Sequence, residues 1–482
     1  MKTNRNIFVY TFLLLMGAAQ VVSCQGNKNT DQPTPVNPEV KTDVQCWLTN
    51  PDRTALLQKQ NISLLFSASD NGFPTIDVDD TQSYQSIDGF GFTLTGGSAT
   101  LINKLPADQQ NALLRELFLP DSNGIGISYL RLSIGASDLS ASVFTYDEMP
   151  AGQTDPQLAK FSIDKEREDL IPVLKKILAL NPNIKILGSP WTAPTWMKTN
   201  NAFIGGSLKP ENFQVYANYF VKYIQAMKAE GITIDAITPQ NEPLHGGNNP
   251  SMVMLAPDQA IFVKANLGPA FKAAGLSTKI ILYDHNADRP DYPISILNDP
   301  AAYPFVDGSA FHLYGGQITA LSVVHSAFPD KNVYFTEQWS DGKGSFANEL
   351  KGNTTNLTIG ATRNWSRNVL QWNLASDPQW NPHTDNGGCS QCLGAVTIGG
   401  TIYRNSSYYV IGHASKFVRP GAVRIASTIT NQLDNVAFKT PDGKHVLIVV
   451  NNNNMPQQFQ IRFKGKLVGA SLNNGAVGTY IW

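Results

Sequence analysis

Residues 184–197 read Ile-Lys-Ile-Leu-Gly-Ser-Pro-Trp-Thr-Ala-Pro-Thr-Trp-Met, which is a short apolar run that passes directly into a turn rich in proline and tryptophan. Such a run predicts a buried β-strand that ends at its first proline. Helical spacing of apolar residues over 166–180 precedes the strand, although Pro172 indicates that this helix is kinked or begins late. A second helix is expected over 211–230. The chain therefore passes here from helix to strand to helix, as in a β/α unit.

The same alternation extends in both directions along the chain. Eight strand-like segments follow one another, most of them separated by a helical segment: Ile87–Leu94, Ser128–Ile134, Ile184–Ser189, Ile234–Thr238, Lys279–Tyr283, Gly308–Leu313, Val333–Thr336 and Val369–Leu374. Eight β/α units in series are typical of an α/β fold, the parallel (β/α)8 TIM barrel, which we assign to residues 83–402. A doubly wound sheet is the main alternative, but no glycine-rich phosphate turn follows the first strand.

The two ends of the chain lack this alternation. Residues 44–82 hold short alternating segments, and residues 403–482 hold one helix followed by strands. We therefore expect an attached β-sandwich domain built from N-terminal and C-terminal strands. The expected elements are strands at Val44–Leu48, Ile62–Phe66 and Thr75–Val78, a helix at Ser406–Val418, and strands at Val423–Ser427, Val436–Lys439, His445–Val450, Gln458–Phe463 and Tyr480–Trp482.

The first residues have the layout of a secretory signal. Lys2 and Arg5 precede an apolar run, and small residues lead to Val-Val-Ser-Cys at 21–24, which predicts a signal peptide over 1–23. The cysteine resembles that of a bacterial lipoprotein, with Cys24 lipidated and followed by a polar tether over 24–43. A chance cysteine behind an ordinary signal is the alternative. We expect an exported outer-membrane lipoprotein, facing the cell surface or the periplasm, whose lipid at Cys24 binds the membrane.

Composition and the other cysteines restrict the partners. The formal net charge is -1, which argues against nucleic acid and fits an uncharged partner such as a sugar polymer. The spacing of Cys389 and Cys392, taken alone, is compatible with a zinc half-site, a redox pair or a small disulfide loop. Because no second Cys-x-x-Cys or close histidine pair is present, and export favours oxidation, we expect the disulfide. Cys46 is expected to be buried and unpaired, and neither a metal nor a cofactor is expected.

Polar residues at the strand ends indicate the chemistry, because barrel enzymes place their working residues there. Asn241-Glu242-Pro243 follows the fourth strand, and Glu337 follows the seventh. Glycoside hydrolysis needs two carboxyl groups that flank the scissile bond, and a closed barrel brings these strand ends to one rim. A single glutamate there is more often a solvated loop residue, so the pair carries the argument. Flat rings that can stack on sugars also lie in or near these ends, at Trp191, Trp196, Trp339, Trp365, Trp372 and Trp380.

Six stretches carry a family resemblance: Asp88-Gly-Phe-Gly91, Leu130-Arg-Leu-Ser-Ile-Gly135, Ser189-Pro-Trp-Thr-Ala-Pro-Thr-Trp-Met-Lys-Thr-Asn200, Gln240-Asn-Glu-Pro243, Phe335-Thr-Glu337 and Gln371-Trp-Asn-Leu374. Over nearly all of residues 44–482 the chain resembles glycoside hydrolase family 30, which includes lysosomal glucosylceramidase and microbial β-1,6-glucanases. The resemblance implies a retaining hydrolase with Glu242 as acid/base and Glu337 as nucleophile, the latter supported by Arg131. It further implies that a sugar is held by Asp138, Trp191, Asn241 and Trp372, with His312 and Tyr314 nearby.

Departures from the glucosylceramidases bear on the substrate. Phe92, Gly96 and Gln371 stand where those enzymes have other residues, and the loop with Cys389 and Cys392 resembles that of the β-1,6-glucanases. We therefore expect an endo-β-1,6-glucanase that acts by double displacement. A glucosylceramidase or β-glucosidase is the alternative, and a xylanase lies further off. A non-catalytic glycan-binding lipoprotein is an alternative of another class, disfavoured because both glutamates are present.

Overall fold

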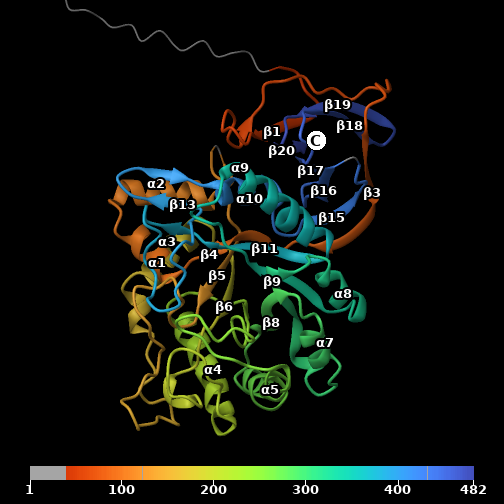
Figure 1. Ribbon diagram of the computed structural model, residues 1–482. Coiled ribbons are helices and arrows are strands. Elements are labelled where there is room, and N and C mark those ends of the chain that lie inside the picture. Colours follow the sequence, from red (N-terminus) through yellow and green to blue (C-terminus); the bar gives the residue numbers. More distant parts are fainter. Residues whose placement is uncertain (1–39, 122, 431) are drawn as a thin grey trace, which may run out of the picture. The chain divides into compact units, whose positions relative to one another are not determined.

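A computed structural model describes residues 40–482, except 122 and 431 (Figure 1). The expected signal peptide, the lipidation site at Cys24 and most of the tether lie outside the described residues. Eight parallel strands close into a barrel in which each strand pairs with the next, and β11 pairs with β4. They are β4 (Gly89–Thr93), β5 (Tyr129–Ser133), β6 (Lys185–Ser189), β7 (Ala236–Ile237), β8 (Lys279–Ala287), β9 (Val306–Gly316), β10 (Asn332–Glu337) and β11 (Ser366–Asn373). The predicted TIM barrel is confirmed.

The barrel is filled by side chains from successive strands. Tyr129, Leu187, Ala236, Ile281, Ala310, Tyr334 and Leu370 form one buried apolar cluster, with one residue from each of seven barrel strands. Such a filled interior makes the barrel a rigid core rather than a channel. The site must therefore lie at the end of the barrel, where the strands pass into loops.

Helices follow most of the strands along the chain (Figure 1). The α-helices are α1 (Gly96–Asn103), α2 (Ala107–Phe118), α3 (Leu170–Leu180), α4 (Phe213–Ala229), α5 (Ala256–Phe262), α6 (Gly268–Ala273), α7 (Asp291–Leu297), α8 (Ala320–Ala327), α9 (Phe346–Asn353) and α10 (Ser406–Ser415). Short 3₁₀ turns lie at Asp164–Arg167, Thr195–Met197, Pro210–Asn212 and Tyr303–Phe305, and π-helical segments at Val263–Leu267 and Thr354–Ala361.

Two helix predictions can be compared with these bounds. The helix predicted over 166–180 begins late, at Leu170, so that Pro172 lies in its first turn, where its missing N–H costs no intrahelical bond. The sequence also predicts a helix over Pro257–Ala274, and this segment is helical from Ala256 to Ala273, although not uniformly α-helical. It is divided by a π-helical segment directly before Gly268-Pro269, because that proline cannot donate the bond that would continue the α-helix.

The second unit of structure is the β-sandwich, whose strands are hydrogen-bonded in the order β19-β18-β3-β15-β16-β17-β20-β1-β2. The strands from before the barrel pair among those from after it: β1 with β20, and β3 between β18 and β15. This discontinuous β-sandwich is as predicted. Its strands are β1 (Gln45–Thr49), β2 (Gln58–Lys59), β3 (Thr75–Ser86), β15 (Val423–Ser427), β16 (Leu433–Lys439), β17 (His445–Asn451), β18 (Gln457–Phe463), β19 (Lys466–Leu472) and β20 (Val477–Ile481).

Details of the β-sandwich differ from the sequence-based expectation. The strand expected at Ile62–Phe66 is wrong, because this segment joins no strand ladder. The Leu64 carbonyl accepts from the N–H groups of Asp43 and Val44, but the Leu64 and Phe66 N–H groups bond to side chains of Thr42 and Asp43 instead of a neighbouring backbone. Strand β19 was not predicted. Cys46 is buried in the sandwich core with a free thiol, and burial raises the pKa of that thiol to about 12.

A small sheet beside the barrel holds the cysteine-bearing segment. Strand β12 (Ala375–Ser376) pairs with β13 (Val396–Ile398), which pairs with β14 (Ile402–Arg404). The chain between β12 and β13, residues 377–395, therefore leaves and rejoins the fold at two adjacent strands. We call it the cysteine loop.

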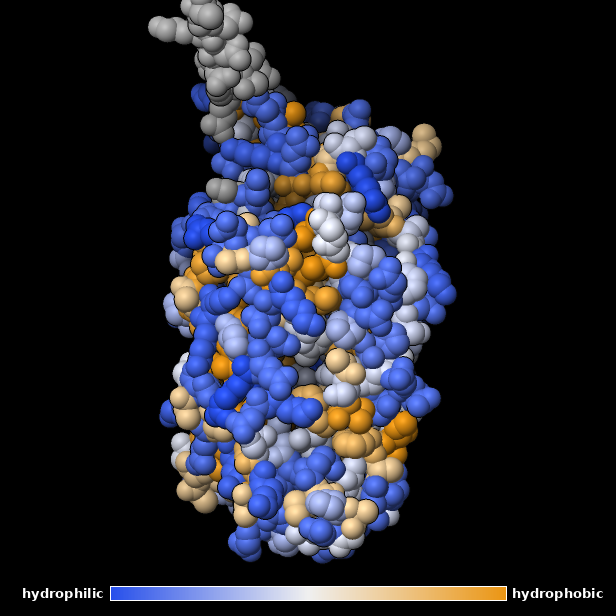
Figure 2. All heavy atoms as spheres, turned by 90° about the vertical axis from the view of Figure 1, so that its left-hand side faces the viewer, coloured by the Kyte–Doolittle hydropathy of each residue, from blue (hydrophilic) through white to orange (hydrophobic). Residues whose placement is uncertain are grey.

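On the face shown in Figure 2, hydrophilic residues predominate and apolar residues gather in separate patches. Within the described part of the chain, no helix has the length and apolar character needed to cross a membrane.

Candidate active site

A cavity of about 480 Å³ opens where the barrel strands pass into their following loops. It is lined by Asp138, Trp191, Glu242, Leu244, His245, Asn248, His285, Asn286, Tyr314, Glu337, Trp339, Trp372, Cys389 and Cys392. Three further residues to which the family resemblance gives a role, Arg131, Asn241 and His312, are buried behind this lining. Arg131 and His312 are hydrogen-bonded to the lining, and Asn241 is hydrogen-bonded to Arg131. A larger cavity, about 840 Å³, is lined by residues such as Trp47 and Trp482 and contains none of these side chains.

Irregular backbone aims the polar side chains into the cavity. Glu242 has φ 46°, and Tyr283 and Asp284 have φ 72° and 67°. The register between β8 and β9 shifts next to Asp284, and that between β10 and β9 shifts before Glu337. Bulges of this kind redirect a side chain, and each positive φ at a non-glycine residue costs about 1–3 kcal/mol. The rest of the fold sustains this strain at the strand ends that carry the carboxylates.

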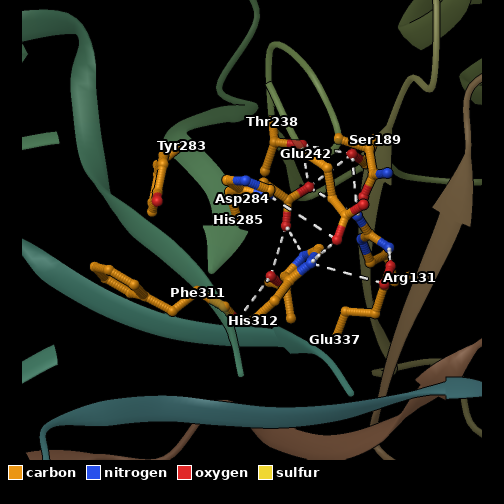
Figure 3. A network of polar contacts seen from close by, with 12 residues as sticks. Arg131, Ser189, Thr238, Glu242, Tyr283, Asp284, His285, Phe311, His312 and Glu337 are labelled. Atoms are coloured by element: carbon orange, nitrogen blue, oxygen red, sulfur yellow. Dashed lines mark hydrogen bonds and ion pairs between the residues drawn. The ribbon is translucent and has the colours of Figure 1, made fainter. Parts of the chain in front are cut away.

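Arg131 on β5 is the centre of a buried polar network (Figure 3). Its side chain is fully buried and donates to Glu337 Oε2 at 2.6 Å, Asn241 Oδ1 at 2.6 Å and Asp284 Oδ2 at 2.8 Å. A guanidinium presents several donors in one fixed plane, so it can hold three acceptors at once. The bonds fix the Glu337 carboxylate against the barrel and keep a positive charge beside it.

Asp284 anchors the other side of this network. The hydroxyls of Ser189 and Thr238 lie 2.7 Å from its Oδ2, and Thr336 donates to Oδ1 at 2.6 Å. Burial raises the pKa of Asp284, but the charge of Arg131 and the bond from His312 outweigh burial and hold that pKa well below its usual range. Asp284 is therefore a permanent buried anion.

His312 joins Asp284 to Glu242. Its Nε2 lies 3.1 Å from Asp284 Oδ1, and its Nδ1 lies 3.2 Å from Glu242 Oε1. Burial lowers the pKa of His312, but the negative charges of Glu337, Asp284 and Glu242 raise it to about 9. At neutral pH the imidazole is therefore protonated and donates to both carboxylates.

The same hydrogen bond sets the protonation of Glu242. Burial raises the pKa of Glu242, and the bond and charge of His312 lower it further than burial raises it. In the free site the proton shared by this pair consequently resides on the histidine, one hydrogen bond away from the carboxylate. Asn248 Nδ2 lies 3.3 Å from the other oxygen of Glu242.

Glu337 faces Glu242 across the cavity. The Tyr314 hydroxyl donates to Glu337 Oε1 at 2.9 Å. Burial raises the pKa of Glu337, while the charges of His312 and Arg131 lower it, and the net direction is upward. One oxygen of Glu242, one oxygen of Glu337 and one nitrogen of His312 lie within 4.8 Å of one another. That spacing is also suitable for metal ligands, but a cation there would have to displace the proton of His312.

Aromatic rings and a carboxylate form a further wall of the cavity. The rings of Trp191 and Trp372 stack with their centroids 5.1 Å apart, and the Arg131 guanidinium lies 4.8 Å from the Trp191 ring centroid. Asp138 is buried beside them, and burial together with the charges of Glu337 and Glu242 raises its pKa to about 7. This wall brings aromatic rings and a hydrogen-bond acceptor to the cavity, both of which suit a sugar ring.

Comparisons with known proteins agree with this geometry. The family model described as the glycosyl hydrolase family 30 TIM-barrel domain matches residues 87–418, and that of the family 30 β-sandwich domain matches residues 421–480. The chain belongs to glycoside hydrolase family 30. The predicted family is thus confirmed, and the protein is a glycoside hydrolase.

Similar members of family 30 extend over most of the chain. An endo-1,6-β-D-glucanase of Trichoderma harzianum is 36% identical over 411 residues, which are 79% of this chain and 82% of that protein. The lysosomal acid glucosylceramidase of Mus musculus is 30% identical over 431 residues, 83% of this chain and 82% of that one. A solved structure described as an endo-β1,6-glucanase has a TM-score of 0.85 at 37% identity and covers 92% of this chain and 99% of its own.

Sequence reasoning missed two parts of this family 30 site. The first is Asp284, which directly follows the predicted strand Lys279–Tyr283, so its position after a strand is the signal that could have identified it. The second part is the wall beside Glu242, formed by Leu244, His245, Asn248, His285 and Asn286. Leu244, His245 and Asn248 lie in the loop after β7, and His285 and Asn286 lie in the irregular last part of β8, beyond the end of the predicted strand. Neither stretch has a regular apolar period, so the position after a predicted strand was the signal that remained.

Replacing Asp284 by asparagine should lower the free energy of unfolding by about 3–5 kcal/mol. The substitution keeps the shape of the side chain but leaves the buried charges of Arg131 and His312 with less compensation. Urea unfolding followed by tryptophan fluorescence measures the loss. Asp288→Asn, at an exposed position four residues further on, is the control and should change stability little. An Asp284→Asn protein as stable as wild type would contradict the proposed anionic anchor.

Proposed function

We propose that this family 30 hydrolase is a retaining endo-β-1,6-glucanase, with Glu337 as nucleophile and Glu242 as acid/base. The observation that carries the proposal is the spacing of the two glutamates. One oxygen of Glu242 lies within 4.8 Å of one oxygen of Glu337. This close approach fits the carboxyl separation of roughly 5–5.5 Å that retention requires better than the roughly 6.5–9.5 Å that inversion requires. The identity of 36–37% to endo-1,6-β-D-glucanases supports the substrate.

The reaction follows from the positions of these groups. Ionised Glu337 attacks the anomeric carbon, and Glu242 protonates the departing oxygen with the proton that it shares with His312. A covalent glucosyl ester forms on Glu337. Glu242, now ionised, then removes a proton from water, whose oxygen attacks the anomeric carbon and releases Glu337. Two displacements restore the original configuration.

The surrounding residues support these steps. Arg131 and Tyr314 hold Glu337 by one oxygen each, which aims the carboxylate and stabilises it when the ester is cleaved. The stacked rings of Trp191 and Trp372, with Asp138 and Asn241, bind the sugar whose bond is broken. No cofactor takes part in this scheme.

The dependence of kcat/KM on pH should be a bell. Glu337 must be ionised, and because burial raises its pKa above the usual 4.5, activity should fall as pH decreases through a value above 4.5. The His312–Glu242 pair must keep its shared proton, so activity should fall again as pH rises through about 9. Initial rates at low substrate concentration measure both limbs. Activity that is still rising at about pH 10 would exclude His312 as the proton donor to Glu242.

Product analysis tests the substrate. The purified chain lacking its first 24 residues is incubated with linear β-1,6-glucan and, separately, with glucosylceramide. We expect a ladder of β-1,6-linked oligosaccharides from the polymer. Free glucose from the lipid with the polymer untouched would overturn the substrate, and would favour the alternative that the 30% identity to a glucosylceramidase supports.

We further propose that the protein is exported as an outer-membrane lipoprotein, anchored by a lipid on Cys24 and facing the cell surface or the periplasm. The basic residues, apolar run and cysteine of the first 24 residues support this. Metabolic labelling with a fatty acid should label wild type but not Cys24→Ser, whereas the buried-site variant Cys46→Ser should keep the label. Unlabelled wild type found only in the soluble fraction would contradict the proposal.

A further inference from the structure

The cysteine loop forms one wall of the cavity without taking part in the proposed chemistry. Cys389 and Cys392 are joined by a disulfide, as the sequence-based prediction has it, and both line the cavity. Cys392 belongs to one buried cluster with Trp191 and Trp372, and Cys389 packs against it. The disulfide thus lies against the two rings proposed to bind the sugar.

The loop also holds Asp138. The backbone N–H of Cys389 donates to Asp138 Oδ2 at 3.3 Å, and that of Thr384 donates to the Asp138 carbonyl at 2.8 Å. Within the described ranges no ion pair involves the Asp138 carboxylate, which is buried and repelled by the charges of Glu337 and Glu242. The position of the carboxylate therefore depends on uncharged hydrogen-bond donors. One of these donors is the backbone N–H of Cys389, which is itself a residue of the disulfide.

The other end of the disulfide is tied to the nucleophile side of the barrel. The Asn373 side chain donates to the Cys392 carbonyl at 3.4 Å, and Leu393 N–H donates to the Ser340 carbonyl at 3.0 Å. Between the cysteines, Gly342 N–H donates to the Gln391 carbonyl at 2.9 Å. These partners lie at or after β10 and β11, the strands that end at Glu337 and Asn373.

The stretch before Cys389 contains two glycines, which restrict the backbone conformation little. Asn386 and Gly387 have φ 53° and 122°, and Gly388 follows. Without the disulfide, Cys389 would be joined to the bonded Gln391–Leu393 segment only through one intervening serine. Its N–H would then no longer be held in one direction.

We propose that the Cys389–Cys392 disulfide positions Asp138 and closes the sugar-binding wall, so that the catalytic efficiency of this hydrolase depends on the oxidised pair. The inference rests on the proposed role of Asp138 in holding the sugar. The disulfide acts here as a positioning element, because it affects the sugar through Asp138 and the wall rather than through the reaction itself.

The first test compares wild type with the double variant Cys389→Ser/Cys392→Ser. The substrate is whichever of β-1,6-glucan and glucosylceramide wild type cleaves in the product analysis, so a change of substrate overturns the proposed function without affecting this test. We expect kcat/KM to fall roughly tenfold, as when a distant positioning element shifts a contact by a fraction of an ångström. The melting temperature should change little, because a ring of four residues restricts the unfolded chain only slightly.

Chemical reduction supplies an independent measurement that needs no substitution. Treating folded wild type with a dithiol should lower kcat/KM to the level of the double variant, and reoxidation should restore it. The kcat/KM of the double variant should not change on reduction. The kcat/KM of Cys46→Ser, which lacks only the thiol buried in the sandwich, should fall on reduction as that of wild type does. Equal efficiency of the oxidised and reduced enzyme would overturn the proposal.

A double-mutant cycle shows whether the disulfide acts through Asp138. If it does, removing the disulfide from Asp138→Asn should lower kcat/KM by clearly less than removing it from wild type. Fully additive losses would show that the disulfide has a merely structural effect and would overturn the positioning role, even if the first variant is less active.

Discussion

Replacing Glu337 by glutamine should reduce turnover by on the order of 10⁴-fold or more while the protein still binds its substrate. The amide is the same size as the carboxylate but cannot form the glucosyl ester, so double displacement stops at its first step. The fold should survive, because Arg131 keeps its bonds to Asp284 and Asn241. Initial rates give the loss, and isothermal titration with an unreacted oligosaccharide gives the binding.

Glu211→Gln is the matched control for this variant. Glu211 is exposed in the 3₁₀ turn Pro210–Asn212 directly before α4, outside the cavity, so the same chemical change there should leave both rate and binding as in wild type. A Glu337→Gln enzyme that still turns over at the wild-type rate would rule out Glu337 as nucleophile. Loss of binding together with turnover would instead indicate that the variant disturbs the Arg131 network.

The fold could be predicted largely because local patterns determine it. A run such as Ile184–Ser189 has nowhere to bury both faces except a barrel or a covered parallel sheet, and eight runs in series select the barrel. The structure departs from the pattern where a proline alters a helix locally, as at Gly268-Pro269, and where a segment joins no strand ladder, as at Ile62–Phe66. In both places the outcome depends on a few backbone hydrogen bonds, and the periodicity of apolar side chains gives no information about these bonds.

The site could be predicted only in part, for a different reason. Strand-end position identified Glu242 and Glu337, and the family motifs supplied most of the sugar-binding wall. The sequence contains no sign that Asp284 adopts φ 67° and turns inward, because this conformation is imposed by neighbouring strands rather than by the residue. The contact between Cys389 and Asp138 joins residues 251 positions apart and depends on tertiary structure alone.

Replacing Glu242 by glutamine should separate the two steps of the reaction. Hydrolysis of the glucan should fall by about 10²- to 10⁴-fold, because the departing oxygen receives no proton. A dinitrophenyl β-glucoside, whose leaving group needs no proton, should still react in the first step. Its glucosyl ester on Glu337 should then accumulate, because no base activates water. Mass spectrometry of the protein during turnover measures the ester as an added hexose.

Azide distinguishes loss of the acid/base from general damage to the site. As an anion it needs no base, so it should attack the accumulated ester, raise the rate of Glu242→Gln on the dinitrophenyl glucoside and yield glucosyl azide. The azide product should have the β configuration, since it results from two displacements at the anomeric carbon. Wild type and Glu211→Gln should form none. If Glu242→Gln lost activity equally on both substrates and gave no azide product, its loss would not be that of an acid/base, which would contradict the role assigned to Glu242. His312, which lies 3.2 Å from Glu242 Oε1, would then be the next residue to test as proton donor.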